Sequence, residues 1–132
     1  MDINKYTGYF HDGTLININH ERNQMEFLLE SSQILPGKID DKQLLSSDNT
    51  LRGKLHIKNV RKIKVGNKEY KGILRKEYDD GEILDLEINN NKMLLLVEWT
   101  NFPPKARVTD VTKIEIEAEK IQWENIPSLS EN

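Results

Sequence analysis

Residues 78–99 read YDDGEILDLEINNNKMLLLVEW, and this stretch decides the fold class that we predict for the chain. It opens with an Asp-Gly pair at positions 80 and 81, which supplies the backbone freedom that a tight turn needs. Two strand-like runs follow, separated by three Asn. The first run alternates apolar and polar residues with the two-residue period of a β-strand, and the second is apolar on both faces. The stretch therefore predicts a β-hairpin whose second strand lies centrally in a sheet.

Residues 12–30 repeat this pattern when they are moved forward by 68 positions. Their Asp-Gly pair, their loop Asn and their apolar positions then fall on those of the stretch above. A second echo, at an offset of 51, matches residues 57–65 with 108–116, so about 17 extra residues are expected within Pro36 to Arg52. We therefore predict two hairpin-based halves, about 9–66 and about 77–124. The first half carries a loop insertion at about 36–52, and the tail covers 125–132.

Further strand-like runs appear at 14–20, 24–31, 51–58, 60–65, 69–77 and 108–118, with turn signals every 8–12 residues. This spacing predicts an all-β domain, either an antiparallel sandwich or a barrel, with about eight or nine strands. Residues 1–8 are expected to be a lead-in or an edge strand. Asp40 is expected to cap a single helical turn, and an apolar phase shift predicts a bulge near Glu119 and Lys120.

Composition excludes several classes of function. The chain has 132 residues, the usual size of one domain, with 19 basic and 22 acidic residues and a net charge of -3. This balance gives no field that favours nucleic acid or an anionic membrane. The absence of cysteine excludes disulfides, thiolate zinc sites and a cysteine nucleophile. No signal peptide or membrane span is visible, so we expect a soluble, cytoplasmic protein that carries no cofactor.

Glu30 and Glu98 are acids at corresponding ends of the two apolar strands. A carboxyl group desolvated there could have a raised pKa and act as a general acid. If the two acids converged, they could also form a metal site or a glycosidase-like pair, with the carboxyls within roughly 5–10 Å of each other. The favoured interpretation is that each acid pairs with a Lys or Arg or points to solvent.

Aromatic residues gather late in the chain, at Trp99, Phe102 and Trp123, with Tyr78 preceding them. Tryptophan is common at binding hot spots, but it is also common in cores. We expect the tryptophans to belong to the core and Phe102 to be the exposed member. An alternative is that Tyr78, Trp99 and Trp123 line the mouth of a barrel, around a pocket of at least ~300 Å³.

The three histidines, His11, His20 and His56, show no ligand spacing of the HxH or HxxxH kind, so metal binding would need tertiary convergence. Asp12 and Asp80 precede glycines, which is typical of turns. Residues 52–68 are basic and the corresponding strand is acidic, so we expect the two strands to pair and offset their charges. The basic residues are Lys54, Lys58, Arg61, Lys62, Lys64 and Lys68, and the acidic ones are Glu115, Glu117 and Glu119.

Four short patterns carry a resemblance to known proteins: Phe10-x-Asp-Gly, Glu30-Ser-Ser, Gly53-Lys-Leu-His-Ile57, and Glu98-Trp-x-Asn-Phe-Pro-Pro104. Together they resemble small all-β proteins of bacteria that have no assigned activity, some of which look like immunity partners of toxins. The resemblance spans most of the chain and implies a binding role, but it transfers no site.

Three hypotheses of function follow. Catalytic motifs are missing from the sequence, which favours a non-enzymatic protein-interaction module, inhibitor-like or immunity-like. Its partner would be a protein bound through a sheet face or the 36–52 loop, and exposed edge strands would also allow a homodimer. The alternative is a small-molecule or carbohydrate-binding β-barrel. The second alternative is a carboxylate-based hydrolase that uses Glu30 and Glu98.

Overall fold

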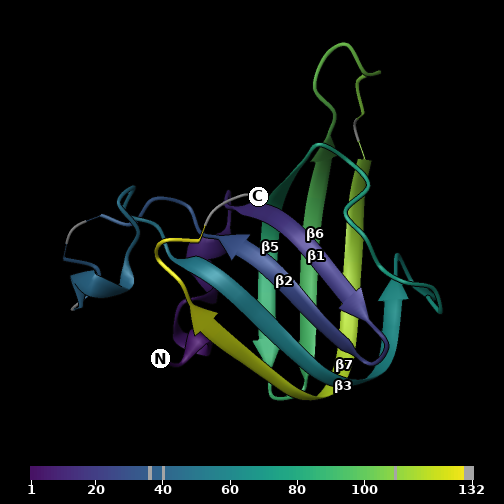
Figure 1. Cartoon of the computed structure of the whole chain (residues 1–132), viewed down its shortest axis with the longest axis horizontal. Coiled ribbons are helices and arrows are strands. Elements are labelled where there is room, and N and C mark those ends of the chain that lie inside the picture. Colours follow the sequence, from purple (N-terminus) through teal and green to yellow (C-terminus); the bar gives the residue numbers. More distant parts are fainter. Residues whose placement is uncertain (36, 40, 109, 130–132) are drawn as a thin grey trace.

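Six antiparallel strands close into a barrel in the computed structural model, and a seventh, short strand extends it (Figure 1). The structure describes residues 1–35, 37–39, 41–108 and 110–129. The strands are β1 (Thr14–Glu21), β2 (Gln24–Glu30), β3 (Arg52–Val65), β4 (Lys68–Glu69), β5 (Asp80–Asn89), β6 (Lys92–Thr100) and β7 (Asp110–Asn125). Three 3-10 helices accompany them, η1 (Ile3–Lys5), η2 (Thr7–Phe10) and η3 (Lys42–Leu44). The all-β prediction is confirmed, and of the two architectures expected the barrel is the one present.

The barrel consists of two three-strand meanders, β1–β2–β3 and β5–β6–β7. Strand β3 joins β7 along most of its length, whereas β1 meets β5 at a single residue pair, Thr14 with Glu82. The order around the sheet is β2-β1-β5-β6-β7-β3-β4, and β2 also pairs with β3. The contact between β1 and β5 is therefore the narrowest line of closure in the wall.

The described residues form seven strands, fewer than the eight or nine that the sequence predicts. Residues 51–58 and 60–65 merge into one strand because Asn59, at φ 54, lets β3 bend without ending. Residues 1–8 fold mainly into 3-10 turns, and the Asp2 side chain caps η1 by accepting from the Asn4 amide at 3.1 Å. Residues 69–77 are irregular after Glu69.

The two hairpins have the same register. A bulge lies between Leu15 and Asn17 in the first and between Ile83 and Asp85 in the second, 68 residues apart. The turns also correspond, with positive φ at Arg22 and Asn90. The offset of 51 for the third strands is wrong, however. Facing residues are Met25 with Ile57 and Met93 with Ile116, so the third strands correspond at an offset of 59.

Two smaller expectations also change. The apolar side of β7 does shift after Ala118, as the phase change near Glu119 and Lys120 predicts, but the register slip lies on β3, between Val60 and Lys62. Asp40 lies outside the described residues. The observed cap of η3 is Asp41, whose carboxylate accepts from the Gln43 amide at 3.0 Å.

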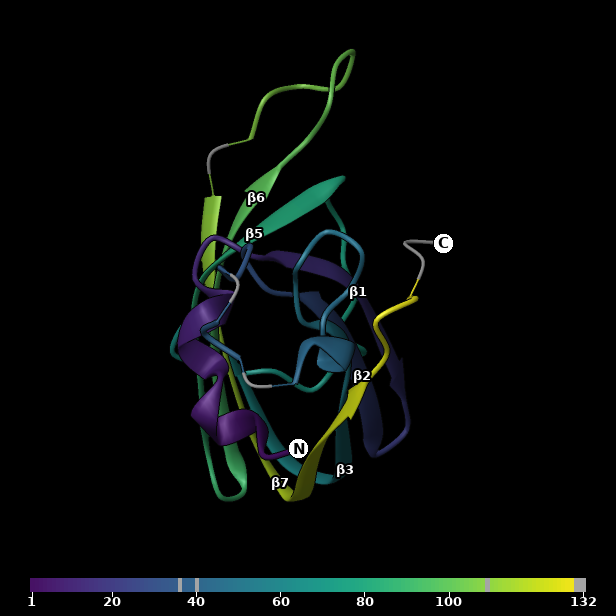
Figure 2. The same cartoon turned by 90° about the vertical axis from the view of Figure 1, so that its left-hand side faces the viewer.

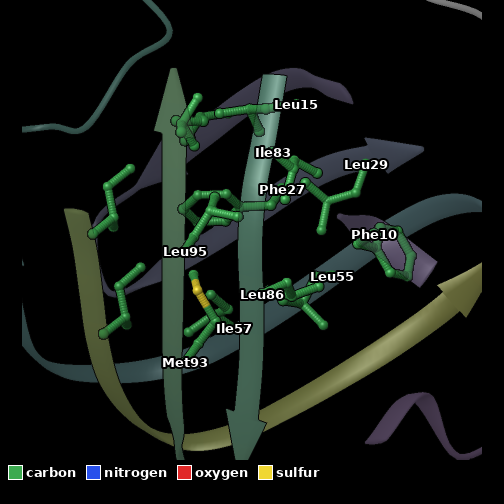
Figure 3. Packing of buried hydrophobic residues seen from close by; sticks show 14 of the residues in the cluster. Phe10, Leu15, Phe27, Leu29, Leu55, Ile57, Ile83, Leu86, Met93 and Leu95 are labelled. Carbon is green, nitrogen blue, oxygen red and sulfur yellow. The ribbon is translucent and has the colours of Figure 1, made fainter. Parts of the chain in front are cut away.

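One apolar core fills the barrel, and inward-facing side chains of all six long strands contribute to it (Figure 3). Full burial of such a side chain contributes about 1.5–3 kcal/mol. One opening of the barrel is covered by η1, η2 and the loop between β2 and β3 (Figure 2). These segments add Ile3, Phe10, Ile34, Ile39 and Leu51 to the core. None of the helices in the described ranges has the length and apolar character required to span a membrane.

Candidate functional site

Glu30 is held in a hydrogen-bonded network on the outside of the barrel. Its Oε2 atom accepts from the Thr50 hydroxyl at 2.8 Å and from Nε of Arg52 at 2.8 Å, and Nη2 of Arg52 also donates to it. The Thr50 hydroxyl in turn contacts that of Ser46 at 2.6 Å. The ion pair is mostly buried, with side-chain exposures of 15% for Glu30 and 17% for Arg52. This network ties the β2–β3 loop to the barrel wall, which is the pairing role favoured for Glu30.

Glu98 lies apart from Glu30. Glu30 pairs with Thr14 across β1 and β2. Thr14 pairs with Glu82, and Glu82 pairs with Glu98, so three inter-strand spacings separate the two acids. At about 4.8 Å each, this row spans about 14 Å, more than a glycosidase-like pair allows. Glu98 is exposed. The described residues also contain no group of His, Asp and Glu side chains placed to hold a metal ion.

Trp99 and Tyr78 form a stacked pair, with ring centroids 5.3 Å apart and planes 27° apart. Trp99 is only 4% exposed, and its Nε1 donates to the Thr112 hydroxyl at 2.8 Å. Gly81 on the neighbouring strand gives the indole room, because a Cβ there would lie 2.9 Å from the ring. Together with Ile18 and other residues, the pair lines a depression of about 230 Å³. This volume is smaller than that of the usual ligand pocket.

Trp123 belongs to a separate aromatic cluster. Its ring meets Phe10 edge to face, with centroids 5.5 Å apart. Its Nε1 donates to the side chain of Asn125 at 3.1 Å, and Asn125 donates to the carbonyl of Leu44 at 2.8 Å. Trp123 does not line the depression beside Trp99. The three rings that the barrel-mouth hypothesis requires are therefore not gathered in one place.

Phe102 is exposed, as the sequence predicts, at 54%. It lies in the β6–β7 loop, residues 101–108, which projects beyond the barrel wall (Figure 1). Asp79 holds the base of this loop by accepting from the Phe102 amide at 2.7 Å and from Nζ of Lys105 at 2.6 Å. These two hydrogen bonds, the one from Lys105 above all, lower the pKa of Asp79 below its ordinary 3.8. Pro103, Pro104, Ala106 and Arg107 are exposed beside Phe102.

The histidines take three separate structural positions. Nδ1 of His11 donates to the Leu84 carbonyl at 2.5 Å, and this bond, reinforced by Asp12, raises the pKa of His11 above 6.5. His20 lies between the Leu74 amide, 2.9 Å from Nδ1, and the Arg22 carbonyl, 3.0 Å from Nε2. His56 lies between two carboxylates, at 2.7 Å from Glu124 and 3.5 Å from Glu26. Spacing in the sequence does not predict these contacts, because partners such as Leu84, Leu74 and Glu124 are distant from the histidines along the chain.

The two Asp-Gly pairs differ in role. Asp12 adopts φ 67 in the turn before β1, as turn chemistry predicts, and its amide donates to the Ile83 carbonyl at 2.8 Å. Asp80, in contrast, is the first residue of β5 and pairs with Thr100. Among the described residues, neither acid belongs to a group of side chains that could hold a metal ion.

The basic strand β3 pairs with the acidic strand β7, as the charge pattern predicts. Lys62 faces Glu117, and Lys64 faces Glu115. Lys54 makes an ion pair with Glu26 at 3.8 Å, and Nδ2 of the Asn59 side chain donates to Glu119 at 2.9 Å. Charges of both signs therefore alternate over this part of the outer wall.

No pattern in the sequence predicts the depression beside β1. We call it the β1 seam and define it as β1 residues 16–21 with the segment 71–79 that lies against them. Leu74 of this segment is buried in the core, whereas Ile73 is 51% exposed. Lys76 reaches from the segment to the Ile16 carbonyl, with its Nζ at 3.1 Å. An open depression of about 1140 Å³ runs along the seam and is lined by residues 17–26, 56–59 and 73–76.

Comparison with protein-family models, with curated proteins and with solved structures finds no significant match. Inferences about function therefore rest on the positions and contacts of the described residues.

Proposed function

We propose that this chain is a non-enzymatic protein-interaction module, inhibitor-like or immunity-like, that acts in the cytoplasm and contacts its partner through the 101–108 loop. The observation that carries the proposal is the presentation of Phe102. A large apolar side chain stands exposed on a loop whose base is fixed by Asp79. Fixing a contact residue before binding reduces the ordering cost of association.

The chemistry around Phe102 indicates the kind of surface that it fits. An exposed aromatic side chain gains most by entering an apolar pocket on the partner. Arg107 lies exposed on the same loop, whereas Lys105 is paired with Asp79, so an acidic group beside that pocket would complement Arg107. The geometry of Glu30 and Glu98 gives the hydrolase alternative no comparable support.

The test compares Phe102→Ala with Leu35→Ala, because Leu35 is 67% exposed and belongs to a different loop. Each purified variant is used as bait in lysate of the source cell, and the affinity for any stoichiometric partner is then measured. Loss of a hot-spot side chain costs about 2 kcal/mol or more, so we expect Phe102→Ala to weaken binding by roughly 30-fold or more. Leu35→Ala is expected to bind like the wild type.

The partner's intact mass, measured before and after incubation, tests the non-enzymatic part of the proposal. We expect an unchanged mass. Retention of the partner by Phe102→Ala at wild-type affinity, the absence of any retained protein, or a changed mass of the partner would each overturn the proposal.

A second candidate function is the binding of a small molecule or carbohydrate beside Trp99. The observation in its favour is that the stacked rings of Tyr78 and Trp99 both line the depression of about 230 Å³. A ligand that raises the melting temperature of the wild type but not of Tyr78→Ala would support this function.

We also infer that the two halves, about 9–66 and 77–124, are copies of one hairpin-based unit. Equal registers, equally placed bulges and equally placed turns support this inference. The corresponding insertion in the first half is then about nine residues, the difference between the offsets of 68 and 59.

A further inference from the structure

The free edge of β1 presents backbone groups that pair with no other strand among the described residues. A two-residue turn makes Glu21 and Gln24 a hydrogen-bonded pair, because these residues directly flank it. Backbone groups alternate in direction along an antiparallel strand, so those of Ile18 and His20 point away from β2. On that side β1 pairs with β5 only at Thr14. Beyond the bulge at Ile16 no described strand pairs with this edge, and segment 71–79 contacts it through the side chains of His20 and Lys76.

Space lies beside this edge. The depression of about 1140 Å³ is lined by residues 17–26, by residues 56–59 of β3 and by residues 73–76, so it borders both β1 and the segment that flanks it. Side chains contribute to the contacts across the seam: the His20 ring accepts from the Leu74 amide, and Lys76 donates to the Ile16 carbonyl. The exposed side chain of Ile73 borders the same space and offers apolar surface to a neighbour.

Residues 16–20 of β1 do not themselves carry the charges that commonly protect exposed strands, and a cation reaches this edge from the neighbouring segment, where Lys76 donates to the Ile16 carbonyl. Natural proteins block free edges with short strands, lysines, prolines or inward-pointing charges. Strand β4, at the far end of the sheet, is two residues long and consists of Lys68 and Glu69. The corresponding part of β5 carries Asp85 and Glu87. Residues 16–20 of β1 read Ile-Asn-Ile-Asn-His, with no Lys, Pro or acid.

We propose that the β1 edge pairs with the β1 edge of a second copy of this chain, antiparallel about a twofold axis at Ile18. The amide of Ile18 would donate to the carbonyl of Ile18 of the partner subunit, and the carbonyl of Ile18 would accept from the amide of that residue. The His20 amide would then donate to the carbonyl of Ile16 of the partner subunit, because a carbonyl oxygen that accepts from Lys76 still has a second lone pair. On the outer face, Asn17 would lie opposite Asn19 of the partner subunit, where two amide side chains can hydrogen-bond and no like charges meet.

Self-complementarity favours a second copy over an unrelated strand. An antiparallel pairing centred on Ile18 sets apolar residues opposite apolar residues or His, and amides opposite amides, along the whole of residues 16–20. This inference goes beyond the proposed function, because it uses neither Phe102 nor the 101–108 loop.

The test is sedimentation equilibrium of the full chain from micromolar to millimolar concentration. We expect the mass to rise from one chain to two chains. The double variant Asn17→Lys, Asn19→Lys sets lysines opposite lysines, so we expect its dissociation constant to rise by roughly tenfold or more. The control is Asn67→Lys, Asn89→Lys, which adds the same charge at exposed positions outside the seam. Circular dichroism checks that both variants fold.

Hydrogen exchange of the wild type provides the second measurement, and it needs no variant. The amides of Ile18 and His20 are expected to exchange more slowly at high protein concentration than at low. A single-chain mass at every concentration, equal dissociation constants for the seam variant and the control, or exchange at these two amides that is independent of concentration would each overturn the proposal.

Discussion

The first strands of the two meanders, β1 and β5, have the same register and the same bulge, yet their outer edges are covered in different ways. Strand β5 is flanked by η1 and η2, whose Ile3 and Phe10 are buried in the core. We call this contact the β5 seam and define it as residues 3–11 against β5. The β1 seam has an irregular segment in place of the helices, and Ile73 within it remains half exposed.

The two seams share one device. In each, the carbonyl of the bulge residue accepts a hydrogen bond from a side chain that can carry positive charge, supplied by the segment before the other meander. Lys76 donates to Ile16, and His11 donates to Leu84. The same strand geometry can therefore be covered by buried apolar side chains, as at the β5 seam, or remain partly exposed, as at the β1 seam. The residues that precede the neighbouring strand decide which of the two occurs.

The largest expected contrast is between Phe10→Ala in the β5 seam and Tyr78→Ala in the β1 seam. Phe10 is fully buried, so its truncation is expected to lower the free energy of unfolding by about 3–5 kcal/mol. Tyr78 is half-buried, so its truncation is expected to lower the free energy of unfolding by about 1–2 kcal/mol. Urea unfolding of both variants measures these values. Equal losses would mean that the two seams contribute alike to stability.

A smaller contrast is expected from pH, because only the β5 seam contains a histidine on its bulge carbonyl. The pKa of His11 is raised in the folded chain, so the folded state binds more protons than the unfolded state. This contribution to stability is complete below pH 6.5 and is lost as the pH rises through the raised pKa.

The measurement is the free energy of unfolding of the wild type and of His11→Gln on both sides of neutrality. We expect the wild type to lose more stability than the variant as the pH rises. Lys76→Met serves as the matched variant in the β1 seam, where the difference from the wild type is expected to be constant over the same range. Parallel curves for the wild type and His11→Gln would contradict this account.

The smallest effect is expected at the two hairpin turns. Arg22 and Asn90 occupy corresponding positions with φ 56 and φ 53. Asn tolerates this left-handed conformation better than Arg does. Arg22→Asn is therefore expected to stabilise the chain by about 0.5 kcal/mol, and Asn90→Arg to destabilise it by about as much. Thermal unfolding compares the two variants, and shifts of the same sign would break the correspondence between the hairpins.

Local patterns predicted the hairpins well, because alternation and turn residues are read over a few neighbouring positions. The offset of the third strands was wrong for a related reason. The predicted and observed offsets, 51 and 59, differ by an even number, and such a slip keeps every side chain on its own face. The hydrophobic pattern of residues 108–125 therefore could not separate the two registers.

The candidate site was less accessible to prediction from sequence. The exposure of Phe102 and the burial of Trp99 followed from their chemistry and neighbours. The separation of Trp99 from Trp123 depends on how the barrel closes, which no local pattern encodes. The segment 69–77 was read as a strand because of its apolar residues. Leu74 instead fills the gap between β1 and the rest of the wall, and its burial depends on residues that are distant in sequence.

Because β1 and β5 pair only at Thr14 and Glu82, the barrel resembles a sheet whose two outer strands meet along a short line. A barrel with full ladders between all neighbouring strands must break several hydrogen bonds before it opens. Here the wall can open between β1 and β5 while the other ladders stay intact. We therefore expect the two meanders to part first at this line, which the hydrogen bonds of Asp12 and Gly13 with Ile83 also hold. In a limited digestion, a protease that cuts after basic residues would then reach Arg75 in the segment beside that line before it reaches Lys54 or Arg61, which lie within the paired strand β3.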